Sequence, residues 1–209
     1  MMSCCPEEKG SQPDCACQEA PSNGLKPDFP MAGNDTGACC GSQPSDSPIP
    51  FEKPGYHLWG FVEDFMQTPV GETPRVHTQL NREDRRGTVL ARLGIGRDNY
   101  RIAPGLYGVG TPDDGSPVMV TANYKLTFDS LRSSLSGLNA WIMVIDTKSI
   151  NVWCAAGKGT FSTLEVAERV KMVALDKVVA HRRLILPQLA ATGVSARQVK
   201  RMCGFEVVW

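Results

Sequence analysis

Residues 117–146 read PVMVTANYKLTFDSLRSSLSGLNAWIMVID and contain a strand, a helix and a second strand in succession. The apolar run 117–122 predicts a buried strand. The run 140–146 predicts a second strand, and its continuous apolar character indicates that both of its faces are covered. Between the two strands, apolar residues recur at helical spacing and a glycine provides a natural stop: Phe128, Leu131, Leu135 and Gly137.

The C-terminal part of the chain repeats this alternation. Two capping-box patterns, each a Ser followed three residues later by Glu or Gln, predict two further helices: Ser162 with Glu165, and Ser195 with Gln198. The first of these helices would carry one apolar face: Leu164, Ala167, Val170, Ala174 and Val178. The second would end at Gly204, and the stretch FEVVW at 205–209 predicts a last strand.

Alternating strands and helices favour an α/β domain with a largely parallel sheet. Ligands of such domains bind in the crevice beyond the carboxyl ends of the strands. Asn123 and residues 151–159 both follow predicted strands, and Thr121 lies near the end of the first one. We therefore expect these residues to converge on one ligand.

The first 55 residues differ in composition from the rest of the chain. They contain nine of the 15 Pro and six of the eight Cys, but no Val and a single Leu. A segment this poor in apolar residues cannot bury enough surface to offset the entropy of ordering it. The sequence therefore predicts a disordered Cys/Pro/Gly-rich tail over 1–55 and one α/β domain over 56–209, which is long enough for a single core.

The charged residues balance, with 22 Lys and Arg against 22 Asp and Glu. This balance argues against a general nucleic-acid or anionic-membrane surface, where a basic excess supplies the affinity. The sequence has no run of about 18 apolar residues, so we expect no membrane span within it. It also lacks a basic N-terminal region followed by an apolar core, so we expect no secretion signal. The expected location is the cytoplasm, where thiols stay reduced.

The stretch NVWCAAGKG, residues 151–159, places a lone thiol where an apolar strand gives way to a glycine-rich turn. It is not a complete phosphate-binding loop, because Val152 and Gly159 replace the first Gly and the final Ser or Thr of that pattern. The glycines near residue 108 do not complete a dinucleotide fingerprint either, because Asp113 occupies the third glycine position. The sequence therefore argues against a nucleotide site.

Cys154 has two interpretations that need no cofactor. One pairs the thiol with a base from among three His, none of which lies in a recognisable catalytic signature: His57, His77 and His181. The other makes Cys154 a small buried hydrophobe, a common fate of free cysteine, as we expect for Cys203. In that interpretation Trp153 packs in the core, and Gly157 and Gly159 form a tight turn.

Two longer stretches carry a resemblance to a known family. PGLYGVGTPDDGSPVMVTANYKLTFDSLR (104–132) and NAWIMVIDTKSINVWCAAGKGTF (139–161) resemble the corrinoid-binding domain of the large subunit of the acetyl-CoA-pathway corrinoid iron-sulfur protein. With Cys inside N-V-W-C-A-A-G-K, the chain is more specifically similar to the corrinoid protein of microbial mercury methylation. The resemblance extends over residues 75–209.

This resemblance implies a Rossmann-like domain with a cap helix that holds a corrinoid, a cobalamin-type cofactor, with the nucleotide base displaced from cobalt. It implies that Cys154 is the lower axial ligand of cobalt and the catalytic residue. The remaining residues of the implied cofactor site are Asn151, Val152, Trp153, Ala155, Ala156, Gly157, Lys158, Gly159, Thr160, Thr121 and Asn123. A thiolate is a soft, donating ligand that tunes a metal strongly. The sequence also lacks D-x-H-x-x-G, the motif by which many cobalamin enzymes supply a His ligand.

The implied reaction is methyl transfer from methyl-Co(III) to Hg(II), which gives methylmercury. The methyl group would leave as a carbanion, or as a radical with an added electron. The implied partners are a ferredoxin-like iron-sulfur protein, which returns cobalt to its low-valent state, and a methyltetrahydrofolate-linked methyl donor. Two alternatives remain open: a methyl-carrying corrinoid protein of the acetyl-CoA pathway, and a non-enzymatic thiol-rich metal-binding protein.

Two features depart from these families. Full-length mercury-methylation proteins are anchored to the inner membrane by a C-terminal domain of several helices, and this sequence stops at Trp209 before such a segment. The acetyl-CoA-pathway relatives carry an N-terminal four-Cys cluster motif whose spacing is not reproduced here, so we do not expect an iron-sulfur cluster. For the close pairs in the tail, capture of Hg(II) and a merely Cys-rich tail both remain open: Cys4–Cys5, Cys15–Cys17 and Cys39–Cys40.

Overall fold

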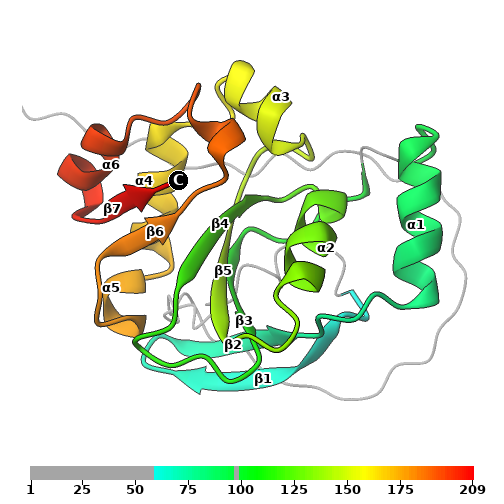
Figure 1. Cartoon of the computed structure of the whole chain (residues 1–209), viewed down its shortest axis with the longest axis horizontal. Helices are drawn as coiled ribbons and strands as arrows, with labels where there is room; N and C mark the ends of the chain where they lie inside the picture. Colours follow the sequence, from blue (N-terminus) through cyan, green and yellow to red (C-terminus); the bar gives the residue numbers. More distant parts are fainter. Residues whose placement is uncertain (1–58, 97–98) are drawn as a thin grey trace, which may run out of the picture. The chain divides into compact units, whose positions relative to one another are not determined.

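The computed structural model describes residues 59–96 and 99–209, and these residues lie within one compact unit (Figure 1). Their strands are β1 (Val62–Thr68), β2 (Gly71–Val76), β3 (Gly105–Val109), β4 (Val118–Ala122), β5 (Ala140–Ile145), β6 (Arg183–Ile185) and β7 (Glu206–Val208). Their helices are α1 (Arg82–Arg92), α2 (Lys125–Ser134), α3 (Val152–Gly157), α4 (Thr163–Met172), α5 (Leu175–Val178), the 3₁₀ helix η3 (Gln188–Ala190) and α6 (Ala196–Cys203). The predicted tail and the six tail cysteines lie outside the described residues.

The strands form one mixed sheet in the order β1-β2-β3-β5-β4-β6-β7. Four of the neighbouring pairs are parallel, namely β2–β3, β4–β5, β4–β6 and β6–β7, so the predicted α/β class and largely parallel sheet are confirmed. The pairs β1–β2 and β3–β5 are antiparallel. Because β3 runs against β5, the carboxyl ends of β4, β5 and β6 meet at one edge of the sheet, and those of β2 and β3 meet at the opposite edge.

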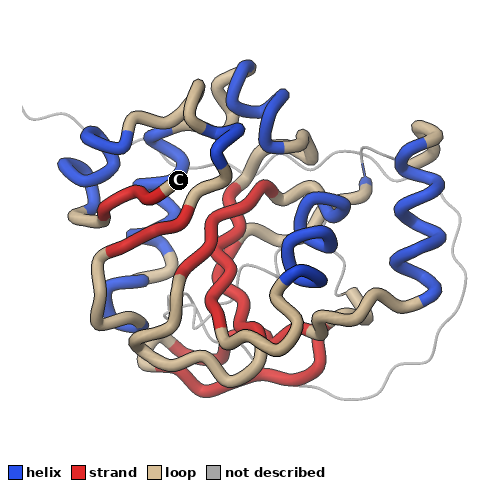
Figure 2. Tube along the Cα trace, viewed as in Figure 1, coloured by secondary structure: helices blue, strands red, loops and turns tan. Residues whose placement is uncertain are grey.

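Helices cover both faces of the central strands (Figure 2). Alternate residues of each strand point to opposite faces, so β5 contributes Met143 to one core and Ile142 to the other. The Met143 face packs against α4 through Val166 and Val170. The other face packs against α2 through Phe128, one of the residues whose spacing predicted this helix. Both predicted strands of the 117–146 unit are therefore buried on both sides, as their apolar runs indicated.

The helix predicted after Ser162 is shorter than its apolar pattern suggested. Ser162 caps it as predicted, because the hydroxyl accepts a hydrogen bond from the Glu165 amide at 3.2 Å. The helix ends at Met172, and Ala174 adopts a left-handed backbone conformation with φ of 44°. This turn starts the separate helix α5 and brings Leu175 fully into the core. The prediction of one continuous helix through residue 178 was therefore wrong.

The last two predicted elements are present. Helix α6 begins after Ser195, although the Ser195 side chain makes no capping hydrogen bond. Gly204 ends the helix in the left-handed conformation, with φ of 79°, that glycine adopts without strain. Strand β7 follows directly and pairs with β6. Within the described ranges, none of the helices combines the length and the apolar character needed to cross a membrane.

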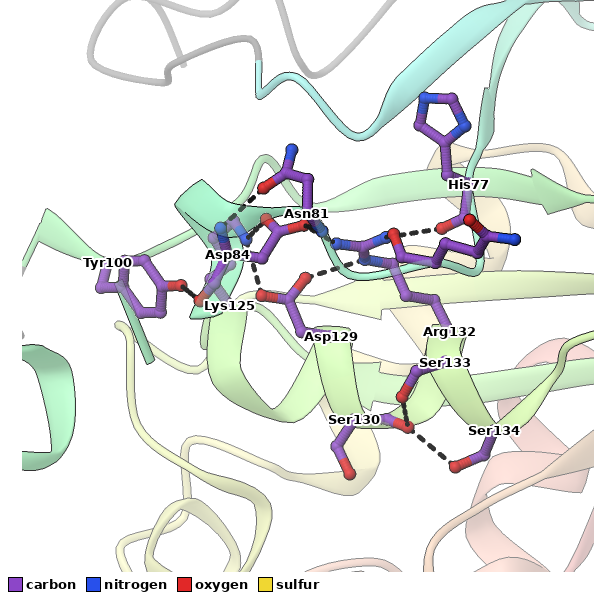
Figure 3. Close-up of polar contacts among 11 residues, drawn as sticks. His77, Asn81, Asp84, Tyr100, Lys125, Asp129, Ser130, Arg132, Ser133 and Ser134 are labelled. Carbon is purple, nitrogen blue, oxygen red and sulfur yellow. Dashed lines mark hydrogen bonds and ion pairs between the residues drawn. The ribbon is translucent and has the colours of Figure 1, made fainter. Parts of the chain in front are cut away.

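A buried ion network joins α1 to α2 (Figure 3). The Lys125 ammonium lies 2.6 Å from carboxylate oxygens of both Asp84 and Asp129. The Arg132 guanidinium lies 2.7 Å from Asp84 and 2.8 Å from Asp129. All four side chains are at most 6% exposed. Two cations and two anions therefore neutralise each other away from water, which is the condition under which buried charges are tolerated.

Further contacts hold this ion network in place. Burial alone would raise the pKa of Asp84, but hydrogen bonds from Lys125 and the Asn81 amide, with the nearby positive charges, lower the pKa below its ordinary value. The Arg132 guanidinium also donates to the backbone oxygens of His77 and Gln79, at 2.6 Å and 3.1 Å. The network thus fixes α2 from Lys125 to Arg132, and this helix follows β4 at the edge of the sheet where ligands are expected.

Candidate functional site

The motif around Cys154 forms a short helix, α3, beyond the carboxyl ends of β4 and β5 (Figure 1). Asn151 caps this helix, because its side-chain oxygen accepts a hydrogen bond from the Cys154 amide at 2.9 Å. The motif was interpreted as a strand end followed by a turn, so the helix begins earlier than that interpretation placed it. Cys154 is therefore held on a capped helical turn, and not in a loop.

The residues of α3 divide into an inner and an outer set. Val152, Ala155 and Ala156 are buried against the core of the domain. Trp153 is 66% exposed, so the interpretation of this residue as core packing was wrong. Cys154 is partly exposed between the two sets. The Cys154 thiol and the Trp153 indole therefore both lie on the solvent-accessible side of α3.

The end of α3 is a tight turn that returns the chain to α4. Gly159 adopts a φ of 75°, which supports the interpretation of this glycine as a turn residue. The Thr160 amide and hydroxyl bond the Ala155 oxygen at 2.9 Å and 3.3 Å, so Thr160 closes the helix. Gly157, Lys158 and Gly159 are exposed at the surface of this turn. Of the predicted site residues after Cys154, these three are the ones that lie open to a ligand.

Cys203 differs from Cys154 in its surroundings. The Cys203 thiol donates a hydrogen bond to the Val199 oxygen at 3.2 Å, and burial raises its pKa above the ordinary value. Its side chain packs against the larger core cluster. The interpretation of Cys203 as a packing residue agrees with this environment, and Cys203 provides a matched control for experiments on Cys154.

Neither of the described His pairs with Cys154. His77 follows β2, whose carboxyl end lies at the sheet edge opposite to α3. His181 precedes β6, and its ring lies 2.9 Å from the Ser116 oxygen ahead of β4, so it also lies at the opposite edge. His57 lies outside the described residues. Within 59–96 and 99–209, the arrangement thus offers no Cys–His pair for nucleophilic catalysis.

Asn123 follows β4 and is fully buried. Its side-chain oxygen accepts hydrogen bonds from the amides of Thr147 and Ser149, both at 3.1 Å. Its side-chain nitrogen donates to Asp146 at 3.0 Å. Asn123 and the Cys154 motif do converge at one edge of the sheet, and the bonds of Asn123 go to the loop that leads into α3.

A cavity of about 480 Å³ is lined by residues of β4, β6 and α2. Thr121 and Val152, two of the predicted site residues, form part of its wall. The wall is largely apolar, and hydroxyl-bearing side chains from β4 and α2 interrupt it: Thr121, Thr127, Ser130 and Ser134. An apolar cavity of this size with a few polar groups is typical of small-molecule sites. Sequence patterns did not reveal the α2 side of this cavity.

Gly193 allows the neighbouring loop to pack closely on α3. A Cβ atom at this position would lie 2.3 Å from the Phe161 oxygen and 3.0 Å from Ala156. We expect Gly193→Ala to displace the loop from α3 and to lower the free energy of unfolding by about 1–3 kcal/mol, as overpacking does. Urea unfolding measures this change.

Gly157→Ala is the control for this prediction. A Cβ atom at Gly157 would meet nothing within 4 Å, and the residue ends α3 with ordinary helical geometry. Alanine is a better helix former than glycine, so we expect this variant to be at least as stable as the wild type. Equal stability of the two variants would contradict the close packing of the Gly193 loop on α3.

Comparison of the sequence with known proteins identifies the family of this chain. The model of the family described as CO dehydrogenase/acetyl-CoA synthase delta subunit, CdhD, matches residues 96–205, which is just over half of the chain. The chain belongs to this family. The matched CdhD region runs from before β3 to the start of β7 and contains Cys154, the cavity and Asn123.

Individual relatives are similar over about half of the chain. Subunit gamma of the acetyl-CoA decarbonylase/synthase complex of Methanopyrus kandleri is 35% identical over 97 residues, 46% of this chain and 21% of the relative. Subunit gamma 2 of Methanosarcina thermophila is 38% identical over 90 residues, 41% of this chain and 19% of the relative. The corrinoid/iron-sulfur protein large subunit of Moorella thermoacetica is 29% identical over 110 residues, 52% of this chain and 24% of the relative.

These relatives confirm the coarser part of the resemblance stated above. The CdhD family member described here is related to corrinoid proteins and to subunits of the acetyl-CoA decarbonylase/synthase complex. The chain spans only about a fifth of the length of these curated relatives, as the covered shares of 21%, 19% and 24% show. The names of these relatives do not extend to mercury methylation, which stays a prediction.

Proposed function

We propose that residues 59–209 form a corrinoid-binding domain that carries a methyl group, with Cys154 as the lower axial ligand of cobalt. The observation that carries this proposal is the position of Cys154. Its helix α3 lies at the carboxyl edge of β4 and β5, and the same helix contributes Val152 to the wall of the cavity. Ligands of α/β sheets bind at this edge.

The residues at this edge fit a corrinoid in three respects. A Cys thiolate is a soft, strongly donating ligand suited to a transition metal. Trp153 and Leu189, which are 66% and 59% exposed on adjoining helices α3 and η3, offer apolar surface to a flat macrocycle. The cavity volume of about 480 Å³ lies within the ordinary range for ligand sites and suits a nucleotide base displaced from the metal.

A bound corrinoid supplies a cobalt ion that accepts and releases a methyl group, while the protein supplies the ligand and the orientation. Cys154 would hold the metal and donate electron density to it, and the cap from Asn151 holds this residue on a helical turn. The hydroxyls of Thr127 and Ser130 would bind polar groups of the displaced nucleotide. The outward position of Trp153 would shield one edge of the macrocycle from water.

The names of the relatives support a methyl carrier for the acetyl-CoA pathway as the function of the domain. That function includes docking to other subunits, since the relatives are named as parts of a complex. A methyltetrahydrofolate-linked donor and a ferredoxin-like iron-sulfur reductant are the proposed partners. The proposed location is the cytoplasm.

One observation favours Hg(II) as a second candidate for the methyl acceptor. Cys154 lies partly exposed on a rigid turn and has no described His partner, which suits a permanent metal ligand better than a nucleophile. A donating thiolate would favour transfer of methyl with its electrons, and Hg(II) is an acceptor for that form. Release of methylmercury by the reconstituted protein distinguishes this acceptor from the first.

Corrinoid uptake by cavity variants tests the proposed site. Ser130 lies exposed on α2 and borders the cavity, so a large side chain there would fill the cavity without entering the core. We expect Ser130→Trp to weaken corrinoid binding at least about tenfold, which corresponds to about 1.4 kcal/mol. Titration of the cofactor-free protein with a cobalamin under anaerobic conditions, followed by visible absorption, measures the affinity.

Ser133→Trp is the matched control for this experiment. Ser133 lies on the same helix, bonds the Ser130 oxygen at 3.0 Å, and is absent from the cavity wall. We expect this variant to bind corrinoid as the wild type does. Equal corrinoid affinity of the two Trp variants would show that the cavity is not part of the corrinoid site. Failure of the wild type to bind corrinoid would overturn the proposed function.

A further inference from the structure

The loop between β5 and α3 has an unusual backbone. Lys148 and Ser149 are consecutive and adopt left-handed conformations, with φ of 57° and 62°. Residues other than glycine avoid this region, which disfavours each of them by roughly a factor of ten. Such a conformation persists only where the surrounding structure holds it.

Asn123 provides the main restraint on this loop. Its side-chain oxygen accepts the amide hydrogens of Thr147 and Ser149, and its nitrogen donates to Asp146. The Asp146 carboxylate in turn accepts the Lys148 amide at 2.9 Å. Asn123 thus directly fixes the amides of Thr147 and Ser149, and it fixes the Lys148 amide through Asp146.

A second restraint reaches the loop from the opposite face of the sheet. The Glu165 carboxylate of α4 accepts the Asp146 amide at 3.0 Å. The same oxygen accepts a hydrogen bond from Arg169 at 2.7 Å, so the Glu165 side chain is itself fixed. The start of the loop is therefore held from both layers of the domain, while its middle depends on Asn123.

We infer that Asn123 is a positioning residue, which holds the 146–150 loop in its left-handed form and thereby sets where α3 presents Cys154. Only one part of the inference rests on the proposed function, namely that the loop places Cys154 for binding the corrinoid. The loop geometry itself belongs to the cofactor-free domain. Asn123 has no exposed surface, so it acts on a ligand through the loop and not by contact.

The inference is tested by amide hydrogen exchange of the cofactor-free protein. Asn123→Leu keeps the branched shape and the number of heavy atoms of the side chain and removes its hydrogen bonds. We expect exchange in residues 146–158 to rise at least about tenfold, while exchange in β3 and β5 stays at the wild-type rate. Adding Ser149→Gly should recover several-fold of the lost protection, because glycine adopts the left-handed conformation without strain.

Asn139→Leu is the matched control, since Asn139 also accepts a loop amide, that of Thr111 at 3.0 Å, but at the opposite edge of the sheet. This variant should leave exchange in 146–158 unchanged. If Asn123→Leu does not fold, Asn123→Ala removes the same hydrogen bonds without adding bulk and should raise exchange in the same residues. Unchanged exchange, or a rise that glycine at 149 does not reverse, would overturn the inference and leave Asn123 as a packing residue.

The corrinoid affinity of Asn123→Leu separates this inference from the proposed function. If both hold, the affinity falls together with the loop protection. If wild-type protein takes up no corrinoid, the proposed function fails, while the exchange result still decides the role of Asn123. If the loop loses protection and the corrinoid affinity is unchanged, Asn123 holds the loop but does not position Cys154. The second half of the inference would then be overturned.

Discussion

Cys154→Ala is expected to change the visible spectrum of the corrinoid-loaded protein and to lower methylmercury formation at least about 100-fold. Loss of groups that merely support a metal ligand costs about 10–100-fold, so loss of the proposed ligand should cost no less. The reason lies in the electronics of the metal, because the axial ligand is a main determinant of them. The spectrum is recorded in the cobalt(III) state, and methylmercury is measured at limiting Hg(II).

Cys203→Ala is the control for this prediction, because the Cys203 thiol bonds the Val199 oxygen and lies against the core. We expect its spectrum to match the wild type. Identical spectra for Cys154→Ala and the wild type would show that the thiol is not a cobalt ligand. The domain would then carry methyl groups for the acetyl-CoA pathway without a thiolate ligand, the proposed role of Cys154 would fail, and the Hg(II) acceptor would lose its support.

Lys125→Met is expected to lower the free energy of unfolding by about 3–5 kcal/mol. The substitution leaves the carboxylates of Asp84 and Asp129 buried beside Arg132 alone, with one negative charge uncompensated. A domain of this size is stable by about 5–15 kcal/mol, so the loss removes a large share of its stability. Urea unfolding followed by tryptophan fluorescence measures the change.

Lys171→Met provides the comparison. Lys171 pairs with Glu168 at 3.1 Å, but both side chains are about half exposed, at 51% and 47%. Exposed pairs contribute at most about 1 kcal/mol, so this variant should unfold close to the wild type. Equal losses for the two variants would mean that Lys125 stabilises the domain by something other than its buried charge.

The elements that the sequence predicted are those with a long apolar pattern. Strands β4 and β5 are continuous apolar runs, and α2 has apolar residues at helical spacing before a glycine. Strand β1 escaped detection because it packs few side chains into the core, so its residues show no alternation. Helix α3 is six residues long, too short for a helical period to show. Its signal was the Asn151 cap.

The ion network was missed for a different reason. Asp84, Lys125 and Arg132 are charged, and charged residues in a sequence indicate exposed surface. Their burial depends on how α1 and α2 lie against each other, which no local pattern contains. Two local signs were present: the spacing of Asn81 and Asp84 is that of a capping box, and Lys125 and Asp129 are four residues apart on one helix. The position of Asn123 was predicted, while its hydrogen bonds to the loop required the structure.

The ion network also constrains how this domain can change during evolution. The four side chains are mutually compensating, so a mutation at any one of them is harmful until a second mutation restores neutrality. Replacement of all four by well-packed apolar residues would carry no such penalty, but every single-step path to it passes through a destabilised form. We therefore expect relatives of this domain either to retain Asp84, Lys125, Asp129 and Arg132 together or to replace them together.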